Sequence, residues 1–293
     1  MSAYHTPVMI NEVIKYLDIK PTGVYLDLTF GGGGHAKEIL KNLSTGHLYA
    51  FDQDQDTKIE AEKIKNHNFT YIHANALFIR QFMAYYNIQG LDGILADLGV
   101  SSHQIDNKER GFSTRLNAKL DMRMNTNTTL TAYDIVNYYP EHNLEKVFRD
   151  YGELLCAKKL SETICHYRKS KKIFTTQDLK DIILDKVNVK CKNKIKILSQ
   201  VFQALRIEVN NELNIIQSLI SYAINLLNVN GRLVILSYHS LEDKIVKNLF
   251  CQACKDDLSF ETLTKKPLIP TEEEIKNNKR AHSAKMRVLR RKK

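Results

Sequence analysis

The stretch LDLTFGGGGH, residues 26–35, places four consecutive glycines directly after a short apolar run. Glycine loses more conformational freedom on folding than any other residue, so four in succession are costly unless the backbone must go where no side chain fits. Gly31, Gly33 and Ala36 have the spacing of a turn between a strand and a helix, where backbone N–H groups can approach a ligand. No Gly-Lys-Ser/Thr follows, which excludes a nucleoside-triphosphate P-loop.

Short apolar runs alternate with helical patterns on both sides of this turn. The apolar runs predict strands at 24–28, 47–51, 69–73, 91–98 and 232–237. Helices are expected between the first four, at 34–43, 55–65 and 77–87. A long amphipathic helix is expected from Phe202 to Leu227, ended by Asn230-Gly231. Strands alternating with helices predict βαβ units around a parallel sheet, in an α/β, Rossmann-like fold.

This alternation is interrupted once. The segment 107–200 shows helical patterns and no convincing strand, so we predict a discontinuous sheet domain, 1–106 with 201–293, around an all-helical insertion. The insertion leaves after the strand that ends at Asp97, near the carboxyl edge where open α/β sheets bind ligands. A substrate platform is therefore expected there, with structural decoration as the alternative.

The net charge of +10 is unevenly distributed. Basic residues concentrate in three segments, at 158–172, 186–196 and 276–293. Clustered positive charge attracts polyanions because binding releases their counterions. A solvated surface would explain any single cluster, but the three together favour nucleic acid as a partner.

The composition also argues against several classes of protein. No apolar run approaches the length of a membrane span, and the first residues lack the pattern of a secretory signal. Five irregularly spaced cysteines are typical of reduced thiols in a cytoplasmic protein. Only one C-x-x-C pair occurs, at Cys251 and Cys254, so no metal site is expected.

Carboxylates follow the strands near the glycine turn. Asp52 ends the second strand, where it can accept hydrogen bonds from both hydroxyls of a ribose. This pattern fits two cofactors, a nicotinamide dinucleotide and S-adenosylmethionine. Asp27 and Asp97 suit the amine and sulfonium of S-adenosylmethionine better than a pyrophosphate. Methyl transfer is therefore favoured, and an NAD-dependent oxidoreductase is the alternative.

Several segments, in order along the chain, resemble the RsmH/MraW family of bacterial-type methyltransferases. The segments are HTPVM (5–9), YLDLTFGGGGH (25–35), DGILADLGVSS (92–102), RGFS (110–113), LDMRM (120–124), FQALRIEVNNEL (202–213), SYHSLEDKIVK (237–247) and AHSAK (281–285). Members of this family modify the N4 amine of a decoding-site cytidine in 16S ribosomal RNA. The resemblance implies a class I methyltransferase fold with a helical insertion and S-adenosylmethionine as methyl donor.

The resemblance also implies a set of cofactor contacts. They fall on Gly33, Gly34, His35, Asp52, Ala76, Asp97 and Gln104. The family usually has phenylalanine at the position of Ala76, so nearby Phe78 is a candidate for the aromatic wall beside the adenine. Phenylalanine is also usual where this chain has Tyr238. The implied partner is 16S rRNA or the small ribosomal subunit, and the chain is either a monomer or a homodimer.

The exocyclic amine of cytosine is a poor nucleophile because its lone pair is delocalised into the ring. Catalysis must align the nitrogen with the methyl group and accept hydrogen bonds from the amine.

Asp97 is the candidate for polarising the amine, and binding only the cofactor is its alternative role. His239 is a candidate proton relay, with structural hydrogen bonding as its alternative. The target base must be unstacked, and Tyr238 is a candidate to stack on it. A non-catalytic RNA-binding or ribosome assembly module is the rival from another class.

Overall fold

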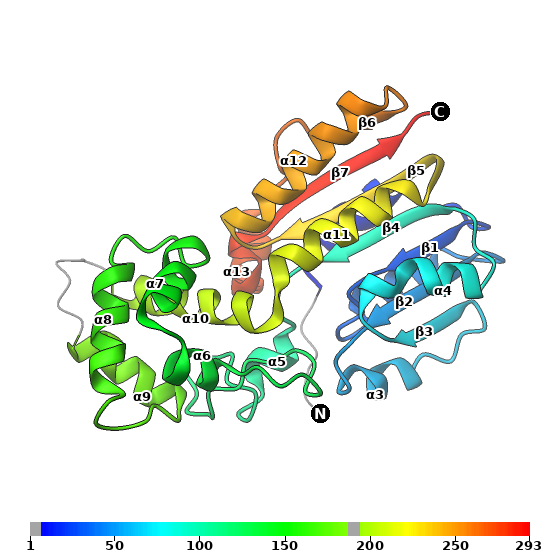
Figure 1. Cartoon of the computed structure of the whole chain (residues 1–293). Coiled ribbons are helices and arrows are strands. Elements are labelled where there is room, and N and C mark those ends of the chain that lie inside the picture. Colours follow the sequence, from blue (N-terminus) through cyan, green and yellow to red (C-terminus); the bar gives the residue numbers. More distant parts are fainter. Residues whose placement is uncertain (1–6, 187–193) are drawn as a thin grey trace. The chain divides into compact units, whose positions relative to one another are not determined.

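The computed structural model describes residues 7–186 and 194–293 (Figure 1). The chain divides into two compact units. The sheet unit comprises residues 1–101 and 213–293, and the helical unit comprises residues 102–212. The helical unit is longer at both ends than the insertion predicted over 107–200. Among the described residues, no helix has the length and apolar character that a bilayer crossing requires.

The described part of the sheet unit holds one mixed sheet. Its strands are β1 (Val24–Asp27), β2 (His47–Asp52), β3 (Phe69–His73), β4 (Leu91–Asp97), β5 (Leu227–Ser237), β6 (Phe260–Thr262) and β7 (Lys285–Arg291). They lie in the order β3-β2-β1-β4-β5-β7-β6. The first five are parallel, β7 is antiparallel to β5, and β6 is antiparallel to β7. The predicted α/β fold with a parallel, Rossmann-like sheet is confirmed.

Helices cover both faces of this sheet. The helical elements are α1 (Ile10–Leu17), α2 (Gly34–Lys41), α3 (Thr57–Glu62), η1 (Ala76–Phe78), α4 (Ile79–Tyr85), α11 (Glu212–Asn225), α12 (Ser240–Asp256), α13 (Glu272–Asn277) and η3 (Lys279–Ser283). Side chains alternate between the two faces of a strand, so Ile94 and Ile235 join one core and Leu95 and Val234 the other. The first core includes residues of α4, α11 and α12, and the second includes residues of α1 and α2.

The long helix predicted over 202–227 is two helices. α10 (Lys194–Asn210) and α11 are separated by Asn211, whose φ of 50° is left-handed. Asparagine tolerates this conformation better than most residues, so it can end one helix without a glycine. The predicted terminator Asn230-Gly231 lies inside β5, which begins at Leu227. It is an irregularity in the strand, with Asn230 at a φ of 66° and a register shift in the pairing with β4.

The basic segment 276–293 contains a strand that the sequence analysis missed. Met286, Val288 and Leu289 of β7 are fully buried. Arg287 is 8% exposed and donates from Nε to Asp243 Oδ1 at 2.6 Å, and Arg290 pairs with Glu261. Each of these two arginines is paired with an acid, Arg287 in a buried place and Arg290 in a half-buried one. These pairs reduce the net positive charge that this part of the segment offers to a polyanion.

The described part of the helical unit contains helices and no strand. Its elements are α5 (Ser102–Asp106), α6 (Ala132–Tyr138), α7 (Glu141–Asp150), α8 (Ala157–Tyr167), α9 (Thr176–Asp181), η2 (Ile182–Lys186) and α10. The helical patterns that the sequence shows in this segment correspond to α6, α7, α8 and α9 with η2. Capping boxes at Thr131 and Thr175 begin α6 and α9. Most of the basic cluster 186–196 lies outside the described residues.

Candidate active site

Three aspartates stand at the carboxyl edge of the parallel strands. Asp27 ends β1 and pairs in register with Ala50 of β2 and Leu95 of β4. Asp52 and Asp97 each lie two residues beyond those partners, at the ends of β2 and β4. Because side chains alternate with a period of two, all three carboxyl groups leave the sheet on the same face. The register therefore gathers three acids at one place.

Asp27 lies deepest, with no exposed surface. Its Oδ1 accepts a hydrogen bond from the backbone N–H of Thr29 at 3.0 Å. Its Oδ2 is buried without a hydrogen-bond partner among the described residues. The pKa of Asp27 is raised to about 6, chiefly by burial. The charge of His35, when its ring is protonated, opposes this rise, and the charges of Asp97 and Asp52 contribute to it. An unpartnered buried carboxylate oxygen is unfavourable by itself and favours a bound cation or donor.

Asp52 fixes the glycine turn from the neighbouring strand. Its Oδ2 accepts from the N–H of Gly31 at 2.8 Å, and its Oδ1 accepts from the N–H of Asp54 at 2.9 Å. Burial nevertheless raises the pKa of Asp52 to about 6, because these two hydrogen bonds only partly oppose it. Each oxygen keeps a second lone pair, so the carboxylate can also accept from a ligand.

Two of the four glycines lie tightly against side chains of the same unit. Gly33 has a φ of 71°, and a Cβ there would lie 2.7 Å from Cζ of Phe30. A Cβ on Gly34 would lie 3.0 Å from Cγ of Pro7. At Gly31, with a φ of 52°, a Cβ would meet nothing closer than 3.9 Å. Phe30 and Pro7 therefore pack against the turn at Gly33 and Gly34, whereas there is free space around Gly31.

Asp97 is held by a tyrosine from the adjacent strand end. The hydroxyl of Tyr238, directly after β5, donates to Asp97 Oδ1 at 2.7 Å. Burial raises the pKa of Asp97 to about 7, the hydrogen bond from Tyr238 lowers it, and the charge of Glu242 raises it. Burial and the Asp97 charge raise the pKa of Tyr238 well above its usual range, so the hydroxyl stays protonated. The side chain of Asp97 is still 24% exposed, which leaves it accessible to substrate.

His35, the second residue of α2, faces the same acids without neutralising them. Its Nδ1 lies 3.8 Å from Asp97 Oδ2, and its Nε2 lies 3.0 Å from the carbonyl oxygen of Val8. A carbonyl can only accept, so the ring proton is on Nε2. Burial lowers the pKa of His35, which keeps the ring neutral. The three carboxyl groups therefore have no resident positive charge at His35.

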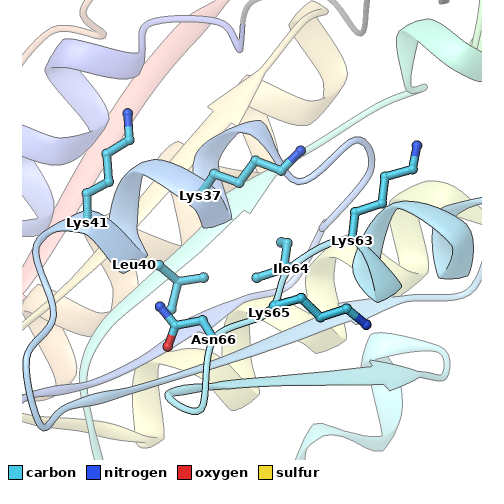
Figure 2. A pocket seen from close by; sticks show the side chains of 7 residues that line it. All are labelled: Lys37, Leu40, Lys41, Lys63, Ile64, Lys65 and Asn66. Atoms are coloured by element: carbon cyan, nitrogen blue, oxygen red, sulfur yellow. The ribbon is translucent and has the colours of Figure 1, made fainter.

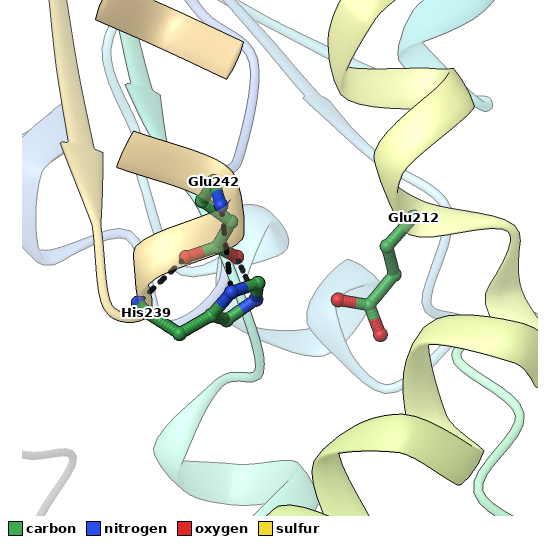
Figure 3. A group of neighbouring side chains, drawn as sticks. All are labelled: Glu212, His239 and Glu242. Carbon is green, nitrogen blue, oxygen red and sulfur yellow. Dashed lines mark hydrogen bonds and ion pairs between the residues drawn. The ribbon is translucent and has the colours of Figure 1, made fainter. Parts of the chain in front are cut away.

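His239 is committed to the start of α12, as Figure 3 shows. It is the N-cap residue, and its Nδ1 accepts from the N–H of Glu242 at 3.4 Å. Its Nε2 lies 3.2 Å from Glu242 Oε1, and its side chain is 9% exposed. Both ring nitrogens face the first turn of the helix. The cap therefore occupies Nδ1, whereas Nε2 has no hydrogen-bond partner among the described residues.

The remaining predicted contacts are less tightly grouped. Ala76 lies in η1 after β3 and packs against the core that includes residues of α4, α11 and α12. Ala74, two residues before it, donates from its N–H to the carbonyl of Asp52 at 3.0 Å. Phe78, at the end of η1, is 51% exposed, so its ring is available to a ligand. Gln104 is buried in α5 and belongs to the helical unit. The sheet unit thus brings together Gly33, Gly34, His35, Asp52 and Asp97.

A basic pocket of the sheet unit was missed because its residues are spread along the sequence. It lies beside α2 and the segment after α3 (Figure 2). Its lining consists of Lys37, Leu40, Lys41, Lys63, Ile64, Lys65 and Asn66. Lys41 is paired with Glu38 of the same helix, and Lys63, directly after α3, is paired with Glu60. The pocket contains none of the predicted site residues, so it is a surface separate from the three aspartates.

Comparison with known proteins extends over nearly the whole chain. A family model described as the MraW methylase family matches residues 2–292. The ribosomal RNA small subunit methyltransferase H of Amoebophilus asiaticus is 48% identical over 298 residues, which cover 98% of this chain and 96% of that protein. The protein of the same name from Flavobacterium johnsoniae is 46% identical, with 97% of each chain covered. A solved rRNA methylase from Streptococcus thermophilus covers 97% of this chain and 94% of its own, at 11% identity and a TM-score of 0.44.

Proposed function

The chain belongs to the MraW methylase family, and from this membership we propose that it methylates the N4 amine of a cytidine in the decoding region of 16S ribosomal RNA. The methyl donor is S-adenosylmethionine. The observation that carries the proposal is the group of three aspartates, one buried and two half-buried, whose pKa values are all raised, around the unpartnered Oδ2 of Asp27. This group of acids suits a cationic ligand.

The charge of the site distinguishes the two cofactors that the glycine turn allows. A sulfonium and an ammonium would each relieve the repulsion among the carboxylates, whereas the pyrophosphate of a nicotinamide dinucleotide would add to it. Bound S-adenosylmethionine supplies an electrophilic methyl group. We propose that the chain holds it through seven residues, Gly33, Gly34, His35, Asp52, Ala76, Asp97 and Gln104. Asp52 would accept from the ribose, and Asp27 from the amine.

Asp97 is the proposed catalytic residue. Its Oδ1 is fixed by Tyr238, so its Oδ2 can accept a hydrogen bond from the cytosine amine. That bond draws the N–H into the plane of the carboxylate and orients the nitrogen lone pair toward the methyl group. His239 is the proposed proton relay, although its present contacts favour the capping role. The amine proton can leave after transfer, so Asp97 does not have to be a strong base.

The substrate is proposed from the names of the two relatives, both of which are small-subunit rRNA methyltransferases. The helical unit is the proposed substrate platform, and a ribosomal substrate implies a cytoplasmic protein. The test is incubation of the enzyme with labelled S-adenosylmethionine and either small ribosomal subunits or naked 16S rRNA, followed by nucleoside mapping. We expect N4-methylcytidine. Label on a ring carbon of cytosine would contradict the proposal, and RNA binding without any label would favour a non-catalytic module.

Binding of the donor should strengthen as pH rises. A cation binds the ionised forms of Asp27, Asp52 and Asp97, whose pKa values are about 6, 6 and 7. The affinity for the donor should therefore increase mainly over the pH range in which these groups lose their protons. Between about pH 5.5 and pH 7.5 we expect the affinity to rise by at least roughly tenfold, with protons released. Calorimetry in two buffers of different ionisation enthalpy measures both quantities. S-adenosylhomocysteine, which lacks the sulfonium charge, should show a smaller rise; an equal or larger rise would contradict the account.

Tyr238→Phe tests whether the tyrosine positions Asp97. Loss of the hydroxyl removes a hydrogen bond that lowers the pKa of Asp97, so that pKa should rise above about 7. The acid limb of the kcat profile should then move upward, by up to about one pH unit, with activity largely recovered at high pH. Tyr25→Phe is the matched control, because it removes a buried hydroxyl that accepts from the N–H of Lys20. A uniform loss of activity at every pH would assign Tyr238 a merely structural role.

A further inference from the structure

Three aromatic rings form a cluster on the surface of the helical unit. Tyr133 stacks on Phe174 with ring centroids 5.4 Å apart and planes inclined by 25°. Tyr133 also meets Tyr138 edge to face, with centroids 5.8 Å apart. Tyr138 is 58% exposed and Phe174 is 55% exposed. We call Tyr133, Tyr138 and Phe174 the aromatic platform; much of its ring surface faces solvent.

The platform is held rigidly from beneath. Asn137 of α6 accepts from the N–H of Ile173 at 3.0 Å and donates to the carbonyl of Ile173 at 2.8 Å. These two bonds fix the loop that carries Phe174 against the helix that carries Tyr133 and Tyr138. Both Asn137 and Ile173 are buried. The exposed rings are therefore pre-positioned, which reduces the entropy lost when a ligand stacks on them.

The basic segment 158–172 ends two residues before Phe174, and its last lysine lies over a ring of the platform. Lys172 Nζ is 4.3 Å from the centroid of Tyr138. Lys171 has a side chain that is 64% exposed and lies 3.8 Å from Asp178, and Lys169 is exposed. Exposed aromatic rings combined with clustered cations are the features by which proteins bind single-stranded nucleic acid. An apolar protein partner would not need the lysines.

We propose that the aromatic platform binds unpaired bases of RNA by stacking, while Lys169, Lys171 and Lys172 contact the phosphates. The proposal rests on the proposed function, because it names the surface by which the helical unit holds its RNA. Stacking tolerates any base, so the platform would supply affinity and register, and base identity would be read elsewhere.

The test uses the full chain and a labelled single-stranded RNA of about ten nucleotides, with an abasic strand of equal length as its counterpart. Tyr138→Ala and Phe174→Ala should each weaken binding of the RNA by about tenfold and leave binding of the abasic strand unchanged. Tyr138→Phe keeps the ring and should bind as the wild type does. Tyr85→Ala, which removes a tyrosine that is 76% exposed in the sheet unit, is the matched control and should have no effect. Lys172→Ala should weaken both strands and reduce the salt slope by about one.

Unchanged RNA binding by both alanine variants would overturn the proposal and leave the platform as a docking surface for protein. If an alanine variant is unstable, the wild-type protein alone still tests the proposal. Equal affinity of the wild type for the RNA and for the abasic strand would also overturn it. Methyl transfer to small subunits is measured in parallel. Methylation with an unchanged KM for RNA in the variants would refute only the platform. Ring-dependent RNA binding by a wild type that transfers no methyl group would refute only the proposed function.

Discussion

Asp97→Asn should lower kcat for methyl transfer by about 10²–10⁴-fold at saturating S-adenosylmethionine. The carboxylate that would accept from the cytosine amine is replaced by an amide, whose oxygen is a weaker acceptor and whose NH₂ group can occupy the same direction. Tyr238 can still donate to the amide oxygen, so the surrounding geometry has little reason to change. Single-turnover transfer of labelled methyl to rRNA measures the chemical step directly.

Two controls separate this effect from loss of the donor and from misfolding. If Asp97 only binds the cofactor, the variant will show a raised Kd for S-adenosylmethionine and a normal kcat at saturation, which would contradict the catalytic assignment. The pKa of Asp97 is raised to about 7 in the folded protein, so its ionised form opposes folding as pH rises toward that value. The asparagine variant should therefore melt roughly 3–6 °C above the wild type at pH 8 and show a smaller difference near pH 5.

Asp52→Ala should weaken binding of S-adenosylmethionine by about 10²-fold or more. The substitution removes the charged acceptors proposed for the ribose hydroxyls, and each hydrogen bond to a charged group contributes about 1.5–3 kcal/mol. It also leaves the N–H groups of Gly31 and Asp54 without their acceptors, so the glycine turn loses its anchor to β2. Calorimetric titration of the donor into the variant gives the Kd.

Asp92→Ala is the matched control for Asp52→Ala. Asp92 stands near the opposite end of β4 and accepts from the N–H of Val24 at 3.0 Å, so its removal also breaks a carboxylate–backbone hydrogen bond. The control should lose stability without losing affinity for S-adenosylmethionine. A normal Kd in Asp52→Ala, or equal losses of affinity in both variants, would show that the ribose is not bound at Asp52.

The parallel part of the fold could be predicted because each strand is a short apolar run between polar turns. The interval 69–73 predicted for β3 matches its bounds, and β4 ends one residue before the predicted limit. β7 was missed because its alternation is hidden: Arg287 and Arg290 stand among apolar residues and are neutralised by partners distant in sequence. The break at Asn211 was missed because the apolar spacing continues from α10 into α11. The periodicity of apolar residues indicates which face of a helix is buried, but it does not reveal one left-handed residue that interrupts the helix.

The sequence shows which acids end the strands of the candidate site, but it does not show which contacts they make. Aspartates at strand ends are visible in the sequence, and parallel pairing brings Asp52 and Asp97 to one edge. The hydrogen bond from Tyr238 to Asp97 joins residues 141 positions apart and depends on the register between β4 and β5. The close contacts of Gly33 and Gly34 depend on where Phe30 and Pro7 pack. Such contacts follow from tertiary structure, so local sequence could not reveal them.

The most direct measurement is a crystal structure of the protein with bound S-adenosylhomocysteine. The account predicts that the adenosyl group lies over the turn at 31–34, with its ribose hydroxyls on Asp52, its amine near Asp27 and its sulfur facing Asp97. Ligand density elsewhere on the molecule, or a ribose bound without Asp52, would contradict it.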